Sequence, residues 1–373
     1  MKKPLRRQPE LDGLRGVLLV WMTLTHLPTH VNAYSNQILG FVSAAEGFIF
    51  LSAVLCGRVF ARKLQQEGIR SVWHRLGARA GRLYAYHLLL LGIAFTVIAR
   101  VAVHTKQASL QGLLDFYLAH RTDGIVASIL LIYRPPLLDI LPMYILFLLL
   151  TPAVLWAGQR WGWRTILSLS LLLWTTAQFG LRSVVYAAFV HLTHSDIPLS
   201  ALGAFDMYAW QLLWIVGLWV GNGRPPILRV SPHPKLALAT SGLIAACLLI
   251  VRHTHWWDVW NAAPWAPLID KWHLGPLRIL NFTALVILFA AVQPATVKWL
   301  GRGPAVLLGR ASLEVFCAHL LICFAALAVV GDGANTTPLV QVGIVVSALL
   351  LLYLVAIACA RDRTSTSPAP QED

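Results

Sequence analysis

The chain has 373 residues, of which 57% are hydrophobic and only 12% are charged, and its mean hydropathy is +0.66. A soluble protein of this length carries about 25% charged residues, so the composition excludes a soluble domain and indicates a polytopic membrane protein. The net charge of +14 does not indicate nucleic-acid binding, because the basic residues lie between apolar runs and form neither one face nor one tail.

Ten apolar stretches have about the 20 residues that a helix needs to cross a bilayer. They predict an all-α bundle with membrane helices over residues 13–32, 39–61, 83–104, 138–158, 164–181, 206–221, 236–252, 277–292, 305–330 and 337–360. Basic residues are concentrated in the loops on the side of the N-terminus, so this side is expected to be cytoplasmic. Ten spans then place both termini there, with one transmembrane domain over 1–361 and a disordered polar tail over 362–373.

The first span carries two ionisable residues, Arg15 and His26. They are eleven positions apart, and at about 100° per residue this spacing places both on one helix face. Because lipid offers such groups no partner, both are expected to face protein or a water-filled cavity. A basic group near one membrane surface and a titratable group in the opposite half would suit chemistry across a bilayer.

The second span returns from the outer side and carries Glu46. The short connection predicts that Glu46 and His26 lie at similar depth on neighbouring antiparallel helices. A carboxylate that holds an imidazole is the usual arrangement of a general base. The alternative interpretation is a structural polar pair that joins the two helices.

The most basic stretch of the chain follows the second span. Its candidate donor-binding residues are Arg58, Arg62, Arg75, Arg79 and Arg82. Arginine side chains are well shaped to bind the phosphates of a cytoplasmic donor. The alternative interpretation is topogenic, with positive charge that keeps this loop inside and contacts anionic lipid headgroups.

An outer loop rich in tryptophan provides the candidate acceptor-binding residues, Trp256, Trp257, Asp258 and Trp260. Interfacial tryptophans usually mark the membrane surface, and the alternative here is a platform on which sugar rings stack. The five cysteines lie in apolar runs without metal-ligand spacing, and the histidine pairs form no zinc motif, so no metal site is expected.

Several segments resemble one family in order along nearly the whole chain. They are PELDGLRGVLLVWMTLTHLP, SAAEGFIFLSAVLCGRVF, GRLYAYHLLLL, PPLLDILPMYILFLLLTP, AWQLLWIVGLWVG, GPLRILNFTAL and LGRASLEVFCAHLL. They look like OpgC-type proteins, ten-span membrane acyltransferases implicated in succinylating osmoregulated periplasmic glucans. The spacing of Arg15 and His26 is also similar to that of the wider family-3 membrane acyltransferases.

The resemblance implies roles for these residues. His26 would be the catalytic base, Arg15 would line the donor passage, and Glu46 stands where the family carries an acidic residue. The implied reaction moves an acyl group, succinyl above all, from acyl-CoA or succinyl-CoA to a hydroxyl of a periplasmic glucan or other envelope glycan. It takes place at the bacterial inner membrane without a tightly bound cofactor. Thr25 departs from the pattern, since the family commonly has an aspartate before the histidine.

Two other functions remain open from the sequence. A transporter or flippase of an envelope glycan or lipid intermediate would use the same intramembrane charges as a substrate path, although inverted repeats and paired broken helices are missing. A non-catalytic subunit of a polysaccharide synthesis complex would instead bind glucan-synthesis proteins. The oligomeric state is open under each function.

Overall fold

The structure is a computed structural model that describes residues 8–223, 233–254, 264–333 and 336–365, without the side chains of 292–298 and 362–365. The secondary structure of these residues is entirely helical, as predicted. The helices are α1 (Pro9–His26), α2 (Val31–Ser35), α3 (Ala44–Ile93), the π-helix η1 (Ala94–Ile98), α4 (Ala99–Thr105), α5 (Ala108–Leu113), α6 (Asp115–Ala119), α7 (Arg121–Ile129), α8 (Ile140–Arg160), α9 (Trp163–Gln178), α10 (Leu181–Thr193), the 3₁₀-helix η2 (Leu199–Leu202), α11 (Met207–Gly221), α13 (Pro234–His253), α15 (Ala266–Ile269), α16 (Pro276–Leu300), α17 (Pro304–Arg310), α18 (Ser312–Val330) and α19 (Pro338–Ser365).

Within the described residues, 6 helical stretches are long and apolar enough to cross a membrane. They are Ala44–Thr105, Ile140–Arg160, Leu199–Gly221, Pro234–His253, Ser312–Val330 and Pro338–Arg361. The chain is therefore a membrane protein by composition and helix length, while the number of ten spans and the cytoplasmic termini stay predictions. Helix α1 is not among the six because Glu10, Asp12 and Arg15 all lie within its 18 residues.

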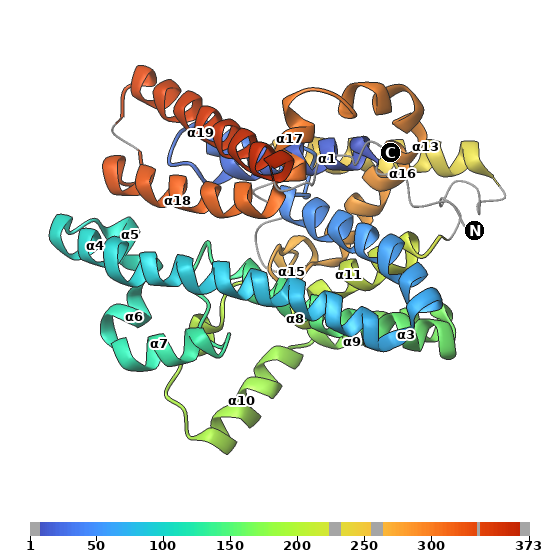
Figure 1. Cartoon of the computed structure of the whole chain (residues 1–373), viewed down its shortest axis with the longest axis horizontal. Coiled ribbons are helices and arrows are strands. Elements are labelled where there is room, and N and C mark those ends of the chain that lie inside the picture. Colours follow the sequence, from blue (N-terminus) through green and yellow to red (C-terminus); the bar gives the residue numbers. More distant parts are fainter. Residues whose placement is uncertain (1–7, 224–232, 255–263, 334–335, 366–373) are drawn as a thin grey trace, which may run out of the picture. The chain divides into compact units, whose positions relative to one another are not determined.

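Helix α3 holds the second predicted span and the start of the third, and its two arms meet at Gly68. This glycine has φ 80° and ψ 175°, a conformation outside the helical region that L side chains rarely adopt. The chain changes direction there (Figure 1), so that Arg79 of the second arm contacts Cys56 of the first. The sequence predicted a loop over 61–83, and the structure replaces it with two helical arms that continue past the membrane segments.

Two further predicted boundaries were wrong for local reasons. The first span was predicted over 13–32, but α1 ends at His26, because Pro28 holds Leu27 in an extended conformation. Pro9 at the first helical position lets α1 begin earlier. The predicted helix 305–330 is divided into α17 and α18 by Ala311, which has φ −100° and ψ 34°.

The described chain forms two compact units. Unit 1 comprises Met1–Asn36, Gln107–Leu110 and Gln293–Asp373, and unit 2 comprises Gln37–Lys106 and Gln111–Val292. Helices α1, α17, α18 and α19 build unit 1, while α3, α8, α9 and α11 pack together in unit 2.

In unit 1, backbones approach closely where α1 meets α17. A Cβ atom added to Gly16 would lie 1.9 Å from the carbonyl oxygen of Ala305, and one added to Gly309 would lie 1.7 Å from that of Asp12. Only glycine leaves room for such contact, which holds α1 against the C-terminal helices. Arg15 lies directly beside this contact in the sequence.

In unit 2, two side-chain contacts between α3 and α16 show how these helices run. Arg278 of α16 pairs with Glu46 of α3. About one turn further along both helices, the ring centroids of Phe50 and Phe282 are 5.3 Å apart. The first arm of α3 and α16 therefore run in the same direction, as ten alternating spans require of the second and eighth.

We expect Gly16→Ala to lower the free energy of unfolding by about 1–3 kcal/mol, because the added methyl overpacks the contact between α1 and α17. Gly343→Ala is the matched control, since a methyl group added to Gly343 of α19 would meet no atom within 4 Å and alanine favours helix. Thermal unfolding in detergent should show a lower midpoint for Gly16→Ala only. Equal midpoints would contradict the close approach.

Candidate functional site

The predicted face of α1 carries Arg15 and His26, and in unit 1 both contact α18. The guanidinium of Arg15 donates a hydrogen bond to the hydroxyl of Ser312. The imidazole of His26 stacks on that of His319, with ring centroids 5.3 Å apart and an interplanar angle of 30°. Ser312 and His319 are seven positions apart, which is close to two helical turns, so they share one face of α18. The two helices run in the same direction, and the predicted face is one side of a polar seam.

His26 lies closer to the end of its helix than predicted. We expected about six helical residues beyond it, but it is the last residue of α1. The carbonyl end of a helix carries partial negative charge, and a positive charge in the last turn is favourable there. The imidazole of His26 therefore lies at the carbonyl end of α1.

His319 was not among the site residues predicted from the sequence. Its side chain is 0% exposed, its Nδ1 lies 3.5 Å from the Sγ of Cys323, and its Nε2 has no hydrogen-bond partner among the described residues. The available signal was a histidine inside an apolar span. Thr25 donates its hydroxyl to the carbonyl of Trp21 within α1.

Glu46 stands at the start of α3 in unit 2 and is only 1% exposed. One carboxylate oxygen accepts hydrogen bonds from both the backbone N–H and the hydroxyl of Ser43, which forms a capping box. The other accepts two from Arg278, at 3.0 Å from Nε and 2.5 Å from Nη2. Arg278 is also 1% exposed, so this is a fully buried ion pair.

A second polar contact joins the same two segments. The side-chain oxygen of Asn281 accepts a hydrogen bond of 2.7 Å from the backbone of Phe41. The neighbouring Gly40 has φ 85°, and a Cβ there would lie 2.5 Å from the same oxygen. Asn281 and Arg278 therefore hold the turn before α3 against the start of α16.

The sequence predicts that His26 and Glu46 form a pair. The two residues belong to different units. Their pairing stays a prediction. In unit 2 the described partners of Glu46 are Ser43 and Arg278, and no sequence pattern indicated Arg278 as one of them.

The five candidate donor residues have different surroundings. Arg79 turns inward and donates to the hydroxyl of Tyr144 at 3.2 Å and to Cys56 at 3.7 Å. Arg75 pairs with Glu67 across Gly68, at 3.0 Å. The remaining three are Arg58, which is half-buried, and Arg62 and Arg82, which are exposed.

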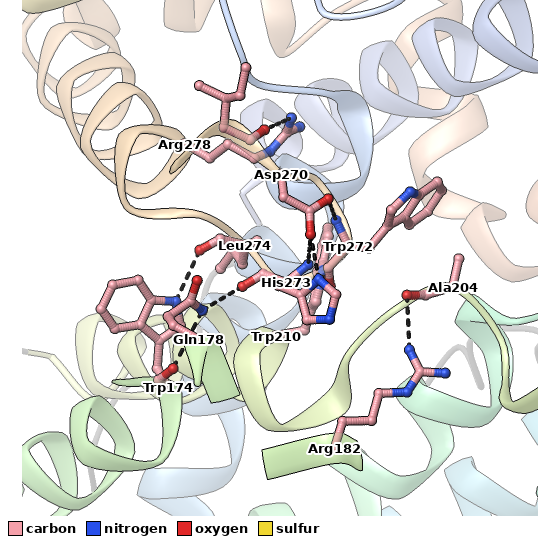
Figure 2. Close-up of polar contacts among 11 residues, drawn as sticks. Trp174, Gln178, Arg182, Ala204, Trp210, Asp270, Trp272, His273, Leu274 and Arg278 are labelled. Atoms are coloured by element: carbon pink, nitrogen blue, oxygen red, sulfur yellow. Dashed lines mark hydrogen bonds and ion pairs between the residues drawn. The ribbon is translucent and has the colours of Figure 1, made fainter. Parts of the chain in front are cut away.

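The predicted acceptor residues Trp256, Trp257, Asp258 and Trp260 lie outside the described residues. The described part of the same connection follows these residues and includes α15. We call the next segment, 270–275, the α15–α16 loop (Figure 2). Its backbone carbonyls are bound by side chains of other elements. That of His273 accepts from Gln178 at 2.7 Å, and that of Leu274 accepts from Trp174 at 3.0 Å.

The side chains of this loop include an acid–imidazole pair. Asp270 accepts a hydrogen bond from the ring of His273 and two more from the backbone N–H groups of Trp272 and His273. The hydrogen bond to Asp270 raises the pKa of His273. Although burial opposes the effect, the hydrogen bonds from His273 and the loop backbone lower the pKa of Asp270. Each residue of this pair therefore stabilises the charged form of the other.

Comparison with known protein families decides the identity at the family level. Residues 7–364 match the family described as OpgC protein. The chain belongs to this family. The resemblance read from the sequence is therefore confirmed over nearly the whole length of this OpgC-family protein. Searches of curated proteins and of solved structures gave no significant match.

We expect Arg278→Leu to destabilise unit 2 by about 3–5 kcal/mol, because it leaves the carboxylate of Glu46 buried without its counter-charge. The double variant Glu46→Leu/Arg278→Leu should recover most of this loss, since an apolar pair can replace a buried ion pair. Denaturant unfolding of the purified protein checks both variants. A double variant as unstable as the sum of the two single variants would contradict the pairing.

The pair of Asp270 and His273 should make the stability of the protein depend on pH on both the acidic and the alkaline side. Its raised pKa means that His273 contributes below the ordinary value of 6.5 and loses this contribution as pH rises through the higher folded-state pKa. Its lowered pKa means that Asp270 contributes above 3.8 and loses this contribution as pH falls through the lower folded-state pKa. The difference in unfolding temperature between wild type and His273→Gln should be largest between pH 3.8 and 6.5, where both contributions are complete, and should disappear in alkali. A difference that persists in alkali would contradict it.

Proposed function

We propose that this OpgC-family protein is a membrane O-acyltransferase. It moves an acyl group, succinyl above all, from an acyl-CoA on the cytoplasmic side to a hydroxyl of a glucan or other envelope glycan on the periplasmic side. Family membership supports the acyl-transfer class, and the apolar helices support a place in the bacterial inner membrane.

The observation that carries the proposal is the seam between α1 and α18. His26 ends α1, where the helix dipole favours positive charge, and its ring stacks on the buried ring of His319. Arg15 lies three helical turns earlier on the same face and is held by Ser312. One titratable group and one permanent cation thus share a polar path along α1, a costly arrangement in a membrane protein unless it has a use.

The reaction follows from these groups. His26 removes the proton of the attacking hydroxyl, whose oxygen forms a bond to the thioester carbonyl carbon. The carbon–sulfur bond then breaks, and the leaving thiolate takes the proton back from the imidazolium. Arg15 lies three helical turns from His26, too far to reach the same carbonyl, and it lines the donor passage instead. Each step is balanced without a covalent enzyme intermediate.

Arg79 supports the donor part of the proposal. Its guanidinium is turned into unit 2, and its described partners are the hydroxyl of Tyr144 and the sulfur of Cys56, neither of which is a carboxylate. A cation with such partners inside a helical bundle favours an anionic ligand, such as the phosphates of coenzyme A or the carboxylate of a succinyl group. Arg58, Arg62, Arg75 and Arg82 belong to the same proposed donor surface.

Replacing the base tests the proposal in cells. We expect His26→Asn to abolish acylation of envelope glucans, because asparagine cannot take the hydroxyl proton, while the protein stays folded in the membrane. His30→Asn, at an exposed position four residues further along, is the matched control and should acylate normally. Mass spectrometry of glucans from both strains would show the acyl mass shift in the control only.

Full acylation by His26→Asn would overturn the mechanism. Glucan that accumulates on one side of the membrane in a deletion strain, with acylation unchanged, would favour a transporter instead. Loss of acylation in both variants would mean that the loss is not specific to His26.

A further inference from the structure

An open cavity of about 540 Å³ lies in unit 2 between the turn before α3, the end of α9 and the α15–α16 loop. Its size is within the usual range for small-ligand sites. The polar side chains that line it are Gln37, Gln178, Asp270, Lys271, His273 and Arg278. Two of the three segments belong to connections that the sequence predicts on the outer side, and the end of α9 lies at the outer end of the fifth predicted span. This is the side of the proposed acceptor.

Gln37 is the first sign that the cavity is built for a ligand. It has φ 60°, a left-handed conformation that is uncommon outside glycine, and its side chain is only 9% exposed. Its amide oxygen has no hydrogen-bond partner among the described residues. A buried acceptor without a donor costs about 1–3 kcal/mol, so this position favours a ligand that supplies a hydroxyl or N–H group.

Lys271 supplies the complementary group. Its ammonium lies 4.9 Å from the centroid of the Trp272 ring and makes no hydrogen bond within the described part of the chain. The cavity therefore offers an unused acceptor in Gln37 and an unused donor in Lys271, the combination that a hydroxyl group satisfies from both sides.

The other charges of the cavity are already neutralised. Arg278 donates its hydrogen bonds to Glu46 and to the carbonyl of Ile269, and Asp270 pairs with His273. A site for a phosphate or carboxylate would present free arginine forks. Among the described residues that line the cavity, the single charge of Lys271 remains, which favours a neutral ligand rich in hydroxyl groups.

Hydrogen bonds from neighbouring elements hold the cavity wall. Besides the carbonyls held by Gln178 and Trp174 (Figure 2), the carbonyl of Trp272 accepts from the indole of Trp210 at 3.1 Å and from the backbone of Asp206 at 3.0 Å. A loop fixed in this way presents its side chains without a further ordering cost, which is a feature of binding sites.

We propose that this cavity binds one sugar unit of the acceptor, with Gln37 accepting from a hydroxyl and Lys271 and His273 donating to the ring substituents. The inference rests on the proposed function for the identity of the acceptor, while sugar binding itself is independent of acyl transfer. It assigns an acceptor site to described residues, next in sequence to the predicted tryptophan platform.

Binding of a β-linked glucose oligosaccharide to full-length protein in detergent tests the proposal. The variant His26→Asn serves as background, so that binding is measured without turnover. We expect Gln37→Asn, which tolerates positive φ but has a shorter side chain, and Lys271→Met each to weaken binding about tenfold. Gln66→Asn at an exposed position of α3 is the control and should bind as the background does.

Separate outcomes decide the two claims. Unchanged binding in both cavity variants would overturn the sugar site, as would competition by inorganic phosphate at lower concentration than the sugar, which would indicate an anion site. Weakened binding in both variants supports the site even if acyl transfer is never observed. In otherwise active protein, the same variants should raise the KM for the oligosaccharide about tenfold and leave the KM for acyl-CoA unchanged.

Discussion

Charged side chains inside a membrane protein must find their counter-groups within the protein, and the buried pair of Glu46 and Arg278 organises unit 2 around that constraint. The pair joins the start of α3 to the start of α16. Through Ile269, Arg278 also holds the α15–α16 loop, and Asn281 holds the turn before α3. The polar cavity lies at this junction because the segments that line it are tied to the same ion pair.

The same constraint explains the polar seam in unit 1, where Arg15 and His26 of α1 face polar side chains of α18. There Arg15 of α1 donates a hydrogen bond to the hydroxyl of Ser312 of α18. Glycines at the contact of α1 with α17 fix the position of this helix, and the seam formed with α18 brings His26 to His319. Stacking on the buried ring of His319 gives the imidazole of His26 a defined orientation.

Hydropathy and spacing predicted the helical class, the segments of α8, α9, α11, α13 and the first part of α16, and the shared face of Arg15 and His26, because these depend on local pattern alone. Local rules would also have predicted the end of α1 before Pro28. The chain reverses direction at Gly68 through a backbone conformation that the basic sequence around it does not indicate. Partners such as Arg278 for Glu46 are 232 positions apart, and no local pattern joins them. An arginine near the start of an apolar span was a usable signal that such a partner exists.

Transfer across a bilayer by the purified protein tests the central claim most directly. Proteoliposomes would enclose the glucose oligosaccharide, and labelled succinyl-CoA would be added outside. The account predicts that label appears on the enclosed oligosaccharide with wild-type protein and not with His26→Asn. Oligosaccharide that leaves the vesicles without label, or label transferred equally by His26→Asn, would contradict it.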